Sequence, residues 1–138
     1  MHLEIVNPAS LGAPKGWNHG VIAPLEGRLL FVAGMAGWSA SLDGEPAGFA
    51  DQFARALDQV LTVVREAGGE ASDVARMTVY VTDLTEYRAS LPALGEAWRQ
   101  RFGRHYPAMA LLEVSGLVDR GAKLEIEATA VLAGRKQP

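Results

Sequence analysis

The stretch VARMTVYVT, residues 74–82, decides the fold, because it is a strand-like segment between two segments with helical periodicity. It is rich in Val, Thr and Tyr, which favour strands. Before it, apolar residues recur every three or four positions from Ala47 to Ala67, and a pair of glycines follows. After it, the same spacing runs from Tyr87 to Phe102, with Gly103 just past the end. Both patterns predict amphipathic helices, so the central strand has a helical connection on each side.

Four further segments read as strands, since they are rich in Val, Leu and Ile and turn residues lie between them. They are His19–Ala23, Arg28–Ala33, Ala108–Val114 and Lys123–Leu132. The order is strand, strand, helix, strand, helix, strand, strand, with a hairpin expected at each end of the chain. This order predicts one α+β domain over residues 1–138, a two-layer sandwich in which a mixed sheet carries both helices on one face.

Two of the expected strands are apolar on both faces. In LLFVA, residues 29–33, both sets of alternating side chains are apolar, and residues 108–114 behave in the same way. Two helices cover only one face of a sheet, whereas a sheet with one face in water alternates cleanly between apolar and polar residues. A second subunit is therefore expected on the other face, which makes the protein a homo-oligomer.

The composition argues against several classes of protein. Of the 138 residues, 49% are hydrophobic and 21% are charged, as in ordinary globular domains and unlike disordered chains. The net charge is −3 and no basic run could follow a phosphate backbone, so nucleic-acid binding is not expected. No apolar run approaches the ~20 residues of a membrane span, and the first residues lack the pattern of a cleavable leader. We expect a cytoplasmic protein without a membrane partner.

Few side chains could support chemistry. The absence of Cys excludes disulfides, thiolate nucleophiles and Cys-ligated metals, and the three His are scattered along the chain. No zinc-protease, phosphate-loop or serine-hydrolase motif occurs, and GMAG at residues 34–37 does not match the dinucleotide fingerprint. No metal and no cofactor are therefore expected.

Two carboxylates in KLEIEA, residues 123–128, point to the same face of a strand because Glu125 and Glu127 are two positions apart. Two interpretations are open. In the first, both carboxylates belong to a solvated or salt-bridged strand face. In the second, a neighbouring subunit or segment covers this face, and a carboxylate there acts as a base on water. Glu113, in a hydrophobic strand, allows the same two interpretations.

Short motifs spread along almost the whole chain carry a family resemblance through their order and spacing. They are VNP at 6–8, GWNHG at 16–20, LFVAGM at 30–35, EAGG at 66–69, SDV at 72–74, VYVTD at 79–83, YPA at 106–108, LEV at 112–114 and EIEA at 125–128. Together they resemble the RidA family, also called the YjgF or L-PSP family, of reactive enamine and imine deaminases. The resemblance implies a chorismate-mutase-like fold and a homotrimer with three ligand clefts between neighbouring subunits.

The resemblance also implies site residues. Glu125 opens the EIEA motif, where members use a Glu to orient the hydrolytic water. Trp17 stands at the position of an aromatic residue in the cleft. Ala33 and Gly34 stand at the positions of a Ser and a Gly that contact the ligand.

The sequence departs from the family at Met109, where archetypal members have an Arg that pairs with the substrate carboxylate. A guanidinium forms a bidentate pair with a carboxylate and a thioether cannot, so the chain resembles a subgroup that lacks this Arg. Deamination of 2-imino acids is accordingly not expected. Three cations, Arg101, Arg104 and Arg120, are candidates to enter the cleft from neighbouring segments.

Two main hypotheses about function follow. The first is hydrolysis of an imine or enamine by water that Glu125 positions, with backbone N–H groups near Gly34 and Leu111 fixing the ligand. The second is a non-catalytic trimer that binds a small, partly apolar metabolite through Trp17, Met35 and Met109. These three side chains also fit a core or interface role. Ribonuclease activity, historically attached to the family name, is disfavoured by the acidic balance and the lack of paired His.

Overall fold

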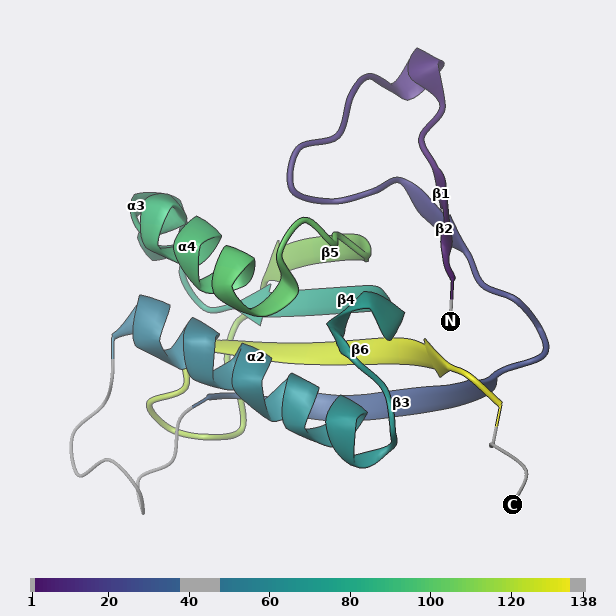
Figure 1. Ribbon diagram of the computed structural model, residues 1–138. Coiled ribbons are helices and arrows are strands. Elements are labelled where there is room, and N and C mark those ends of the chain that lie inside the picture. Colours follow the sequence, from purple (N-terminus) through teal and green to yellow (C-terminus); the bar gives the residue numbers. More distant parts are fainter. Residues whose placement is uncertain (1, 38–47, 135–138) are drawn as a thin grey trace.

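The computed structural model describes residues 2–37 and 48–134, so Ala47, the expected first residue of the first helix, lies outside the described residues. The elements in chain order are β1 (Glu4–Val6), the 3₁₀ turn η1 (Ala9–Leu11), β2 (Gly20–Ile22), β3 (Arg28–Met35), α2 (Phe49–Glu66), the 3₁₀ turn η2 (Ala71–Asp73), β4 (Val74–Val81), α3 (Leu84–Ala89), α4 (Leu91–Phe102), β5 (Ala108–Glu113) and β6 (Leu124–Leu132). The helices form one layer on one face of the sheet (Figure 1), which confirms the predicted two-layer α+β sandwich.

The main sheet has the strand order β3-β6-β4-β5. Strands β4 and β5 are parallel and the other pairs are antiparallel, so the sheet is mixed, as predicted. Both expected hairpins are wrong, because β2 pairs with β1 and β6 lies between β3 and β4 instead of beside β5. The reason is burial. The side chains of Leu124, Ile126 and Ala130 on β6 are fully buried, and a strand this apolar is stabilised most in the middle of a sheet.

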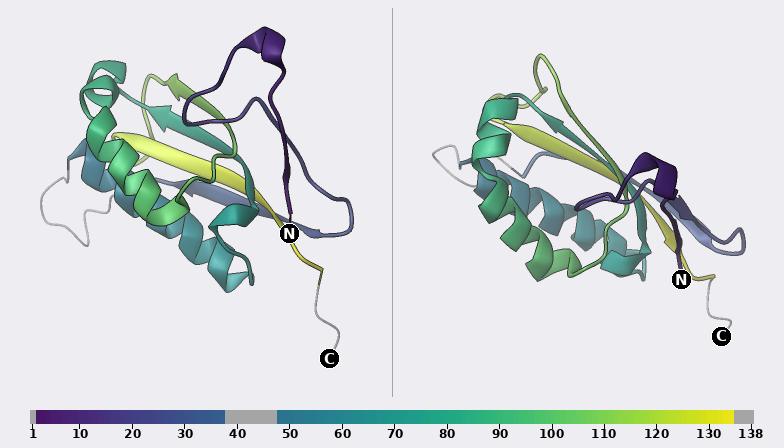
Figure 2. Two further views of the ribbon diagram at one scale, coloured as in Figure 1. Left: turned by 45° about the horizontal axis from the view of Figure 1, so that its top comes forward. Right: turned by 90° about the horizontal axis from the view of Figure 1, so that it is seen from above.

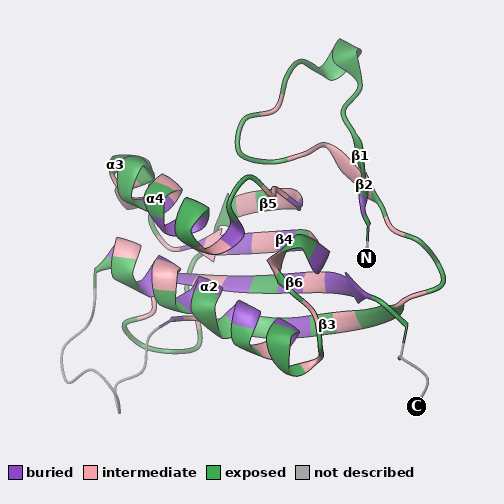
Figure 3. Cartoon of the chain, viewed as in Figure 1, coloured by how far each residue is buried: buried purple, intermediate pink, exposed green. Residues whose placement is uncertain are grey.

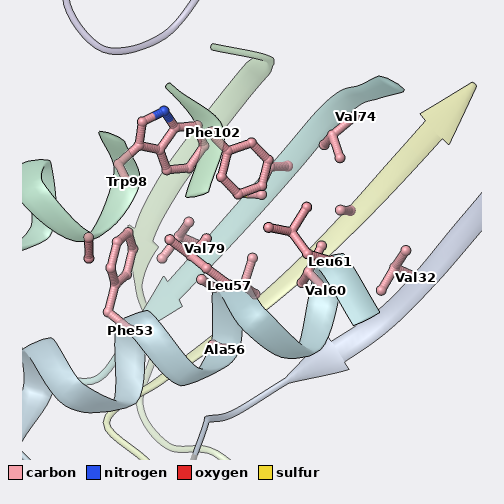
Figure 4. Packing of buried hydrophobic residues seen from close by; sticks show 14 of the residues in the cluster. Val32, Phe53, Ala56, Leu57, Val60, Leu61, Val74, Val79, Trp98 and Phe102 are labelled. Atoms are coloured by element: carbon pink, nitrogen blue, oxygen red, sulfur yellow. The ribbon is translucent and has the colours of Figure 1, made fainter. Parts of the chain in front are cut away.

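The core lies between α2, α4 and the inner face of the sheet (Figure 4). On α2, Leu57, Val60 and Leu61 are fully buried, as the helical spacing predicts. Trp98 and Phe102 of α4 stack with ring centroids 4.3 Å apart. Burying one such Leu or Val contributes ~1.5–3 kcal/mol relative to leaving it exposed, so the α2 face is the largest single contribution to the core.

The helix ends follow local chemistry. The predicted glycine pair ends α2, with the Gly69 N–H donating to the Val64 carbonyl at 2.9 Å. The second helical stretch is in fact two helices, α3 and α4, because Pro92 in the first turn of α4 has no N–H to continue the α3 ladder. The side chain of Asp83 caps α3 by accepting two backbone N–H groups.

The outer face of the sheet is open in the single chain. Leu29 is 63% exposed and Phe31 is 74% exposed, whereas Val32, which points to the helices, is 4% exposed. Figure 3 shows the contrast between the buried inner rows and the exposed arm and loops. The chain therefore covers one face of its sheet and leaves an apolar strand face without helices.

A two-stranded arm, β1 and β2, stands apart from the main sheet (Figure 2). Strand β1 has no periodic signal in the sequence, because its three residues are all exposed and show no alternation. Between the two strands, the chain runs through η1 and a loop that returns to the sheet at β5. This return places the loop beside the start of β5.

Candidate active site

A groove of about 500 Å³ runs along the β5 edge of the sheet, on the side of the helices. Most of its lining comes from the loop before β2, helix α4 and strand β5, and single residues of α2, β4 and α3 complete it. The side chains that line it are mostly aromatic or aliphatic and include Trp17, Tyr87, Leu91, Trp98, Tyr106, Met109 and Leu111. Its size and apolar lining suit a small organic ligand.

Asn18 attaches the loop with Trp17 to the sheet. Its backbone forms a parallel bridge to Ala108, with the Asn18 N–H donating to the Pro107 carbonyl at 3.2 Å. Its side-chain amide donates to the Tyr106 carbonyl, and its oxygen accepts from Asn7 Nδ2 at 2.7 Å. These bonds hold Trp17 at the mouth of the groove, where 40% of its surface is exposed.

Glu125 lies on the opposite face of the sheet. Residues alternate along β6, and Leu124 and Ile126 point inward, so Glu125 points outward, where it is half-buried. Its carboxylate lies directly over the backbone of Gly34, and a Cβ built on Gly34 would overlap it. Strand β3 bulges between Val32 and Met35, which brings the Gly34 backbone under this carboxylate. Residue 34 must therefore be a glycine, because the Glu125 carboxylate lies where a side chain of residue 34 would begin.

The two carboxylates of β6 differ in their contacts. Glu127 accepts a hydrogen bond from the Tyr80 hydroxyl at 2.7 Å. This bond, with burial and the negative charge of Glu127, raises the pKa of Tyr80, so the hydroxyl stays protonated and continues to donate at neutral pH. Glu127 thus has a structural partner, whereas the carboxylate of Glu125 lies against a backbone that has no side chain.

The structure divides the residues expected in the cleft into two groups. Trp17, Met109 and Leu111 line the groove on the helix side. Gly34 and Glu125 lie together on the outer face, beside the exposed Ala33. In the sheet, β6 with Glu125 is two positions from β5, and β3 with Gly34 is three. The two groups also lie on opposite faces, so they do not meet on one ligand within one chain.

Two other candidates have structural contacts. Met35, half-buried after the bulge, packs against the hydrophobic core. The Glu113 carboxylate accepts the Leu84 N–H at 3.1 Å, at the start of α3. Both side chains lie outside the lining of the groove.

The three candidate cations, Arg101, Arg104 and Arg120, do not line the groove of the single chain. Arg101 pairs with Asp58 of α2 at 2.7 Å, and Arg104 and Arg120 are exposed and do not line the groove. The charged side chains that do line it, among the described residues, are Lys15 and Arg99. Sequence reasoning missed them, although the helical spacing of residues 95–102 places Arg99 one turn after Gly95, beside Trp98.

The chain is similar to known proteins along most of its length. The sequence pattern of the family described as Endoribonuclease L-PSP matches residues 8–132. The 2-iminobutanoate/2-iminopropanoate deaminase of Escherichia coli (strain K12) is 32% identical over 105 residues, which cover 76% of this chain and 80% of the relative. The chain belongs to the RidA family. Its fold is the chorismate-mutase-like α+β fold of that family.

Solved structures of the RidA family superpose on almost the whole chain. A Rid-family protein from Yersinia pestis, YyfB, described as of unknown function, has a TM-score of 0.79 at 31% identity and covers 96% of this chain and 100% of its own. TdcF of E. coli, crystallised with bound serine, has a TM-score of 0.64 at 30% identity, covering 88% and 92% of the two chains. TdcF therefore binds a small molecule, and the E. coli relative that is 32% identical is named as a deaminase.

No described helix, over residues 2–37 and 48–134, is long and apolar enough to cross a membrane. In the same part of the chain, no three His, Asp or Glu side chains lie close enough to hold a metal ion.

Proposed function

We propose that this RidA-family protein is a hydrolase that deaminates a reactive imine or enamine at clefts between subunits, with Glu125 orienting the attacking water. One observation carries the proposal: the Glu125 carboxylate lies over the bare Gly34 backbone, while its neighbour Glu127 is bonded to Tyr80. A carboxylate in such a position can accept a proton from a water molecule beside the Gly34 backbone.

The proposed reaction uses one water and releases ammonia. An enamine first tautomerises to the imine. The imine reacts as its N-protonated (iminium) form. The water oxygen adds to the iminium carbon while one water proton passes to the Glu125 carboxylate, which gives a neutral carbinolamine. That proton then passes from Glu125 to the nitrogen, the C–N bond breaks with its electron pair on the leaving ammonia, and the hydroxyl proton is released to solvent, which leaves a carbonyl compound. No redox step occurs, and the reaction as written needs no cofactor.

We further propose that the cleft is completed by a second copy of the chain in a homotrimer. Glu125 and the groove lie on opposite faces of one sheet, so a single chain presents two half-sites. The exposed apolar strand face with Leu29 and Phe31 is the surface that a neighbour would cover. Sedimentation equilibrium at micromolar concentration should give about three times the chain mass of 14.7 kDa. A species of one chain mass contradicts the trimer.

Because Met109 lines the groove where archetypal members have an Arg, we expect slow hydrolysis of 2-iminopropanoate. Replacing Met109 by Arg should raise kcat/KM for this imine by about tenfold or more, since a guanidinium pairs with the carboxylate through two hydrogen bonds. Met109→Lys, with a point charge, should give a smaller rise. The imine is generated by an amino acid oxidase acting on alanine. Semicarbazide traps the imine that the protein has not hydrolysed.

The control for this prediction is the unchanged protein. If it is as fast on 2-iminopropanoate as the Arg variant, another cation already holds the carboxylate and the interpretation of Met109 is wrong. Imines without a 2-carboxylate, generated by an amine oxidase acting on 3-methylbutylamine and 2-phenylethylamine, test the proposed function itself, with ammonia release as the readout. We expect acceleration with at least one of these larger, more apolar substrates.

The apolar groove also favours a second candidate, a non-catalytic trimer that binds a partly apolar metabolite through Trp17 and Met109. The two candidates differ in one respect. Binding without ammonia release from any imine in the panel would support the second, whereas ammonia release that depends on Glu125 would support the first.

A further inference from the structure

We propose that Arg99 and Lys15, at the rim of the groove, bind an anionic group of the ligand and so replace a cation on strand β5. The substrate class is then an imine or enamine with a carboxylate, or a similar anion, at the end of an apolar arm. This inference rests on the proposed function for the imine. The anion site itself is argued from the groove alone.

The charges of the groove carry the first step. Met109 and Leu111 of β5 make the floor apolar, so no cation is available there. Among the described residues of the lining, both charged side chains are cationic, Lys15 on the loop before β2 and Arg99 on α4. An anionic group bound by them would lie above the apolar floor, and the apolar part of the ligand would extend toward Met109.

Gly95 gives the second step. A glycine in the middle of an exposed helix costs about 0.5–1 kcal/mol relative to alanine, and α4 nevertheless has one on the wall of the groove. The Arg99 Nη1 atom lies 3.5 Å from the place where a Cβ of Gly95 would stand. This is an ordinary van der Waals distance, so the guanidinium lies directly beside Gly95, and the absence of a side chain there keeps the groove wall open for a ligand next to it.

Glu96 fixes the orientation of Arg99. The Arg99 Nη2 atom donates to Glu96 Oε2 at 2.8 Å, and Gln100 donates to the other oxygen of Glu96 at 3.2 Å. These bonds lower the pKa of Glu96, so the carboxylate stays ionised and keeps its hold on one side of the guanidinium. An Arg has five N–H donors, and those on the side of Nη1 face the groove wall at Gly95.

The test compares two probes of the same shape, 3-phenylpropionate and its neutral amide, by titration calorimetry on the full-length protein. We expect the carboxylate to bind about tenfold more tightly than the amide at low salt, and this preference to fall at high salt, as expected for an exposed pair. Arg99→Gln should reduce the preference to about twofold or less, and Lys15→Gln should reduce it in part. Arg104→Gln is the matched control and should leave the preference unchanged, because Arg104 is exposed outside the groove.

Three results would overturn the inference: equal affinity for the two probes, no binding of either probe at tens of millimolar, or a preference that survives the double Arg99 and Lys15 substitution. Melting temperatures of the variants show that each is folded. Binding of these probes needs no turnover, so a failure here leaves the role of Glu125 untouched. Conversely, a carboxylate preference without ammonia release from any imine would retain the anion site and reject the proposed function.

Discussion

Replacing Glu125 by Gln is expected to lower the rate of imine hydrolysis by about 100-fold or more while the protein keeps its fold and its ligand affinity. The amide has nearly the same shape as the carboxylate over Gly34, but it does not accept the proton of the attacking water. The rate is measured as ammonia release from the best imine of the panel, and the melting temperature is measured on the same preparation.

Glu127→Gln is the matched control for this prediction. It removes the same charge from the same face of β6, two positions away, where the carboxylate accepts a bond from Tyr80. We expect it to lower the melting temperature slightly and to leave turnover nearly unchanged. If instead Glu125→Gln lowers stability and leaves turnover intact, Glu125 is a structural carboxylate. If neither quantity changes, it does not belong to the site.

Gly37→Ala is expected to lower the free energy of unfolding by at least about 3 kcal/mol. Gly37 is buried at a φ of +68°, and a Cβ there would overlap the Gln52 carbonyl and approach the Ala56 nitrogen of α2 to 2.7 Å. Its N–H donates to the Gln59 side chain at 3.1 Å. The strand and the helix would have to separate to make room, so denaturant unfolding should show a much lower midpoint.

Gly68→Ala separates the two causes of this loss. Gly68 also has a positive φ, +91°, but the nearest atom to its Cβ position is Arg28 Nη2 at 4.0 Å. That variant should lose only about 1–2 kcal/mol, the cost of the backbone conformation alone. Both variants are compared at one protein concentration, because the stability of the proposed trimer would depend on it. Equal losses would mean that the overlap with α2 contributes nothing.

These two glycines show how far the sequence could be interpreted. In the sequence, GMAG at residues 34–37 shows only that it does not match the dinucleotide fingerprint, whereas the structure gives each of these two glycines its own reason. Gly34 lies under a carboxylate of β6, and Gly37 lies against the backbone of α2. Both partners are distant in sequence, so no local pattern could have identified them.

The helical segments, the mixed sheet and the approximate limits of β3, β4 and β6 were predictable because periodicity and strand composition are local signals, but these signals did not separate α3 from α4. The strand order was not, since which strand lies in the middle depends on how much apolar surface each buries against both neighbours. For a similar reason, the sequence did not show that the candidate site residues lie on two faces of the sheet. Met109 and Glu125 each stand at a position that the family uses in its cleft. Only the pairing of β4 with β5 and β6 shows that the two side chains lie on opposite faces of the sheet.

The central claim, catalysis by Glu125 at a cleft completed by a neighbouring subunit, is tested most directly by mixing two inactive variants. One is Glu125→Gln, and the other is Gly95→Phe, which fills the groove on α4. After unfolding and joint refolding in equal amounts, about one quarter of the clefts combine an intact groove with an intact Glu125 from the neighbour. The account predicts ammonia release at about that fraction of the unchanged protein's rate; a mixture as inactive as its two components would contradict it.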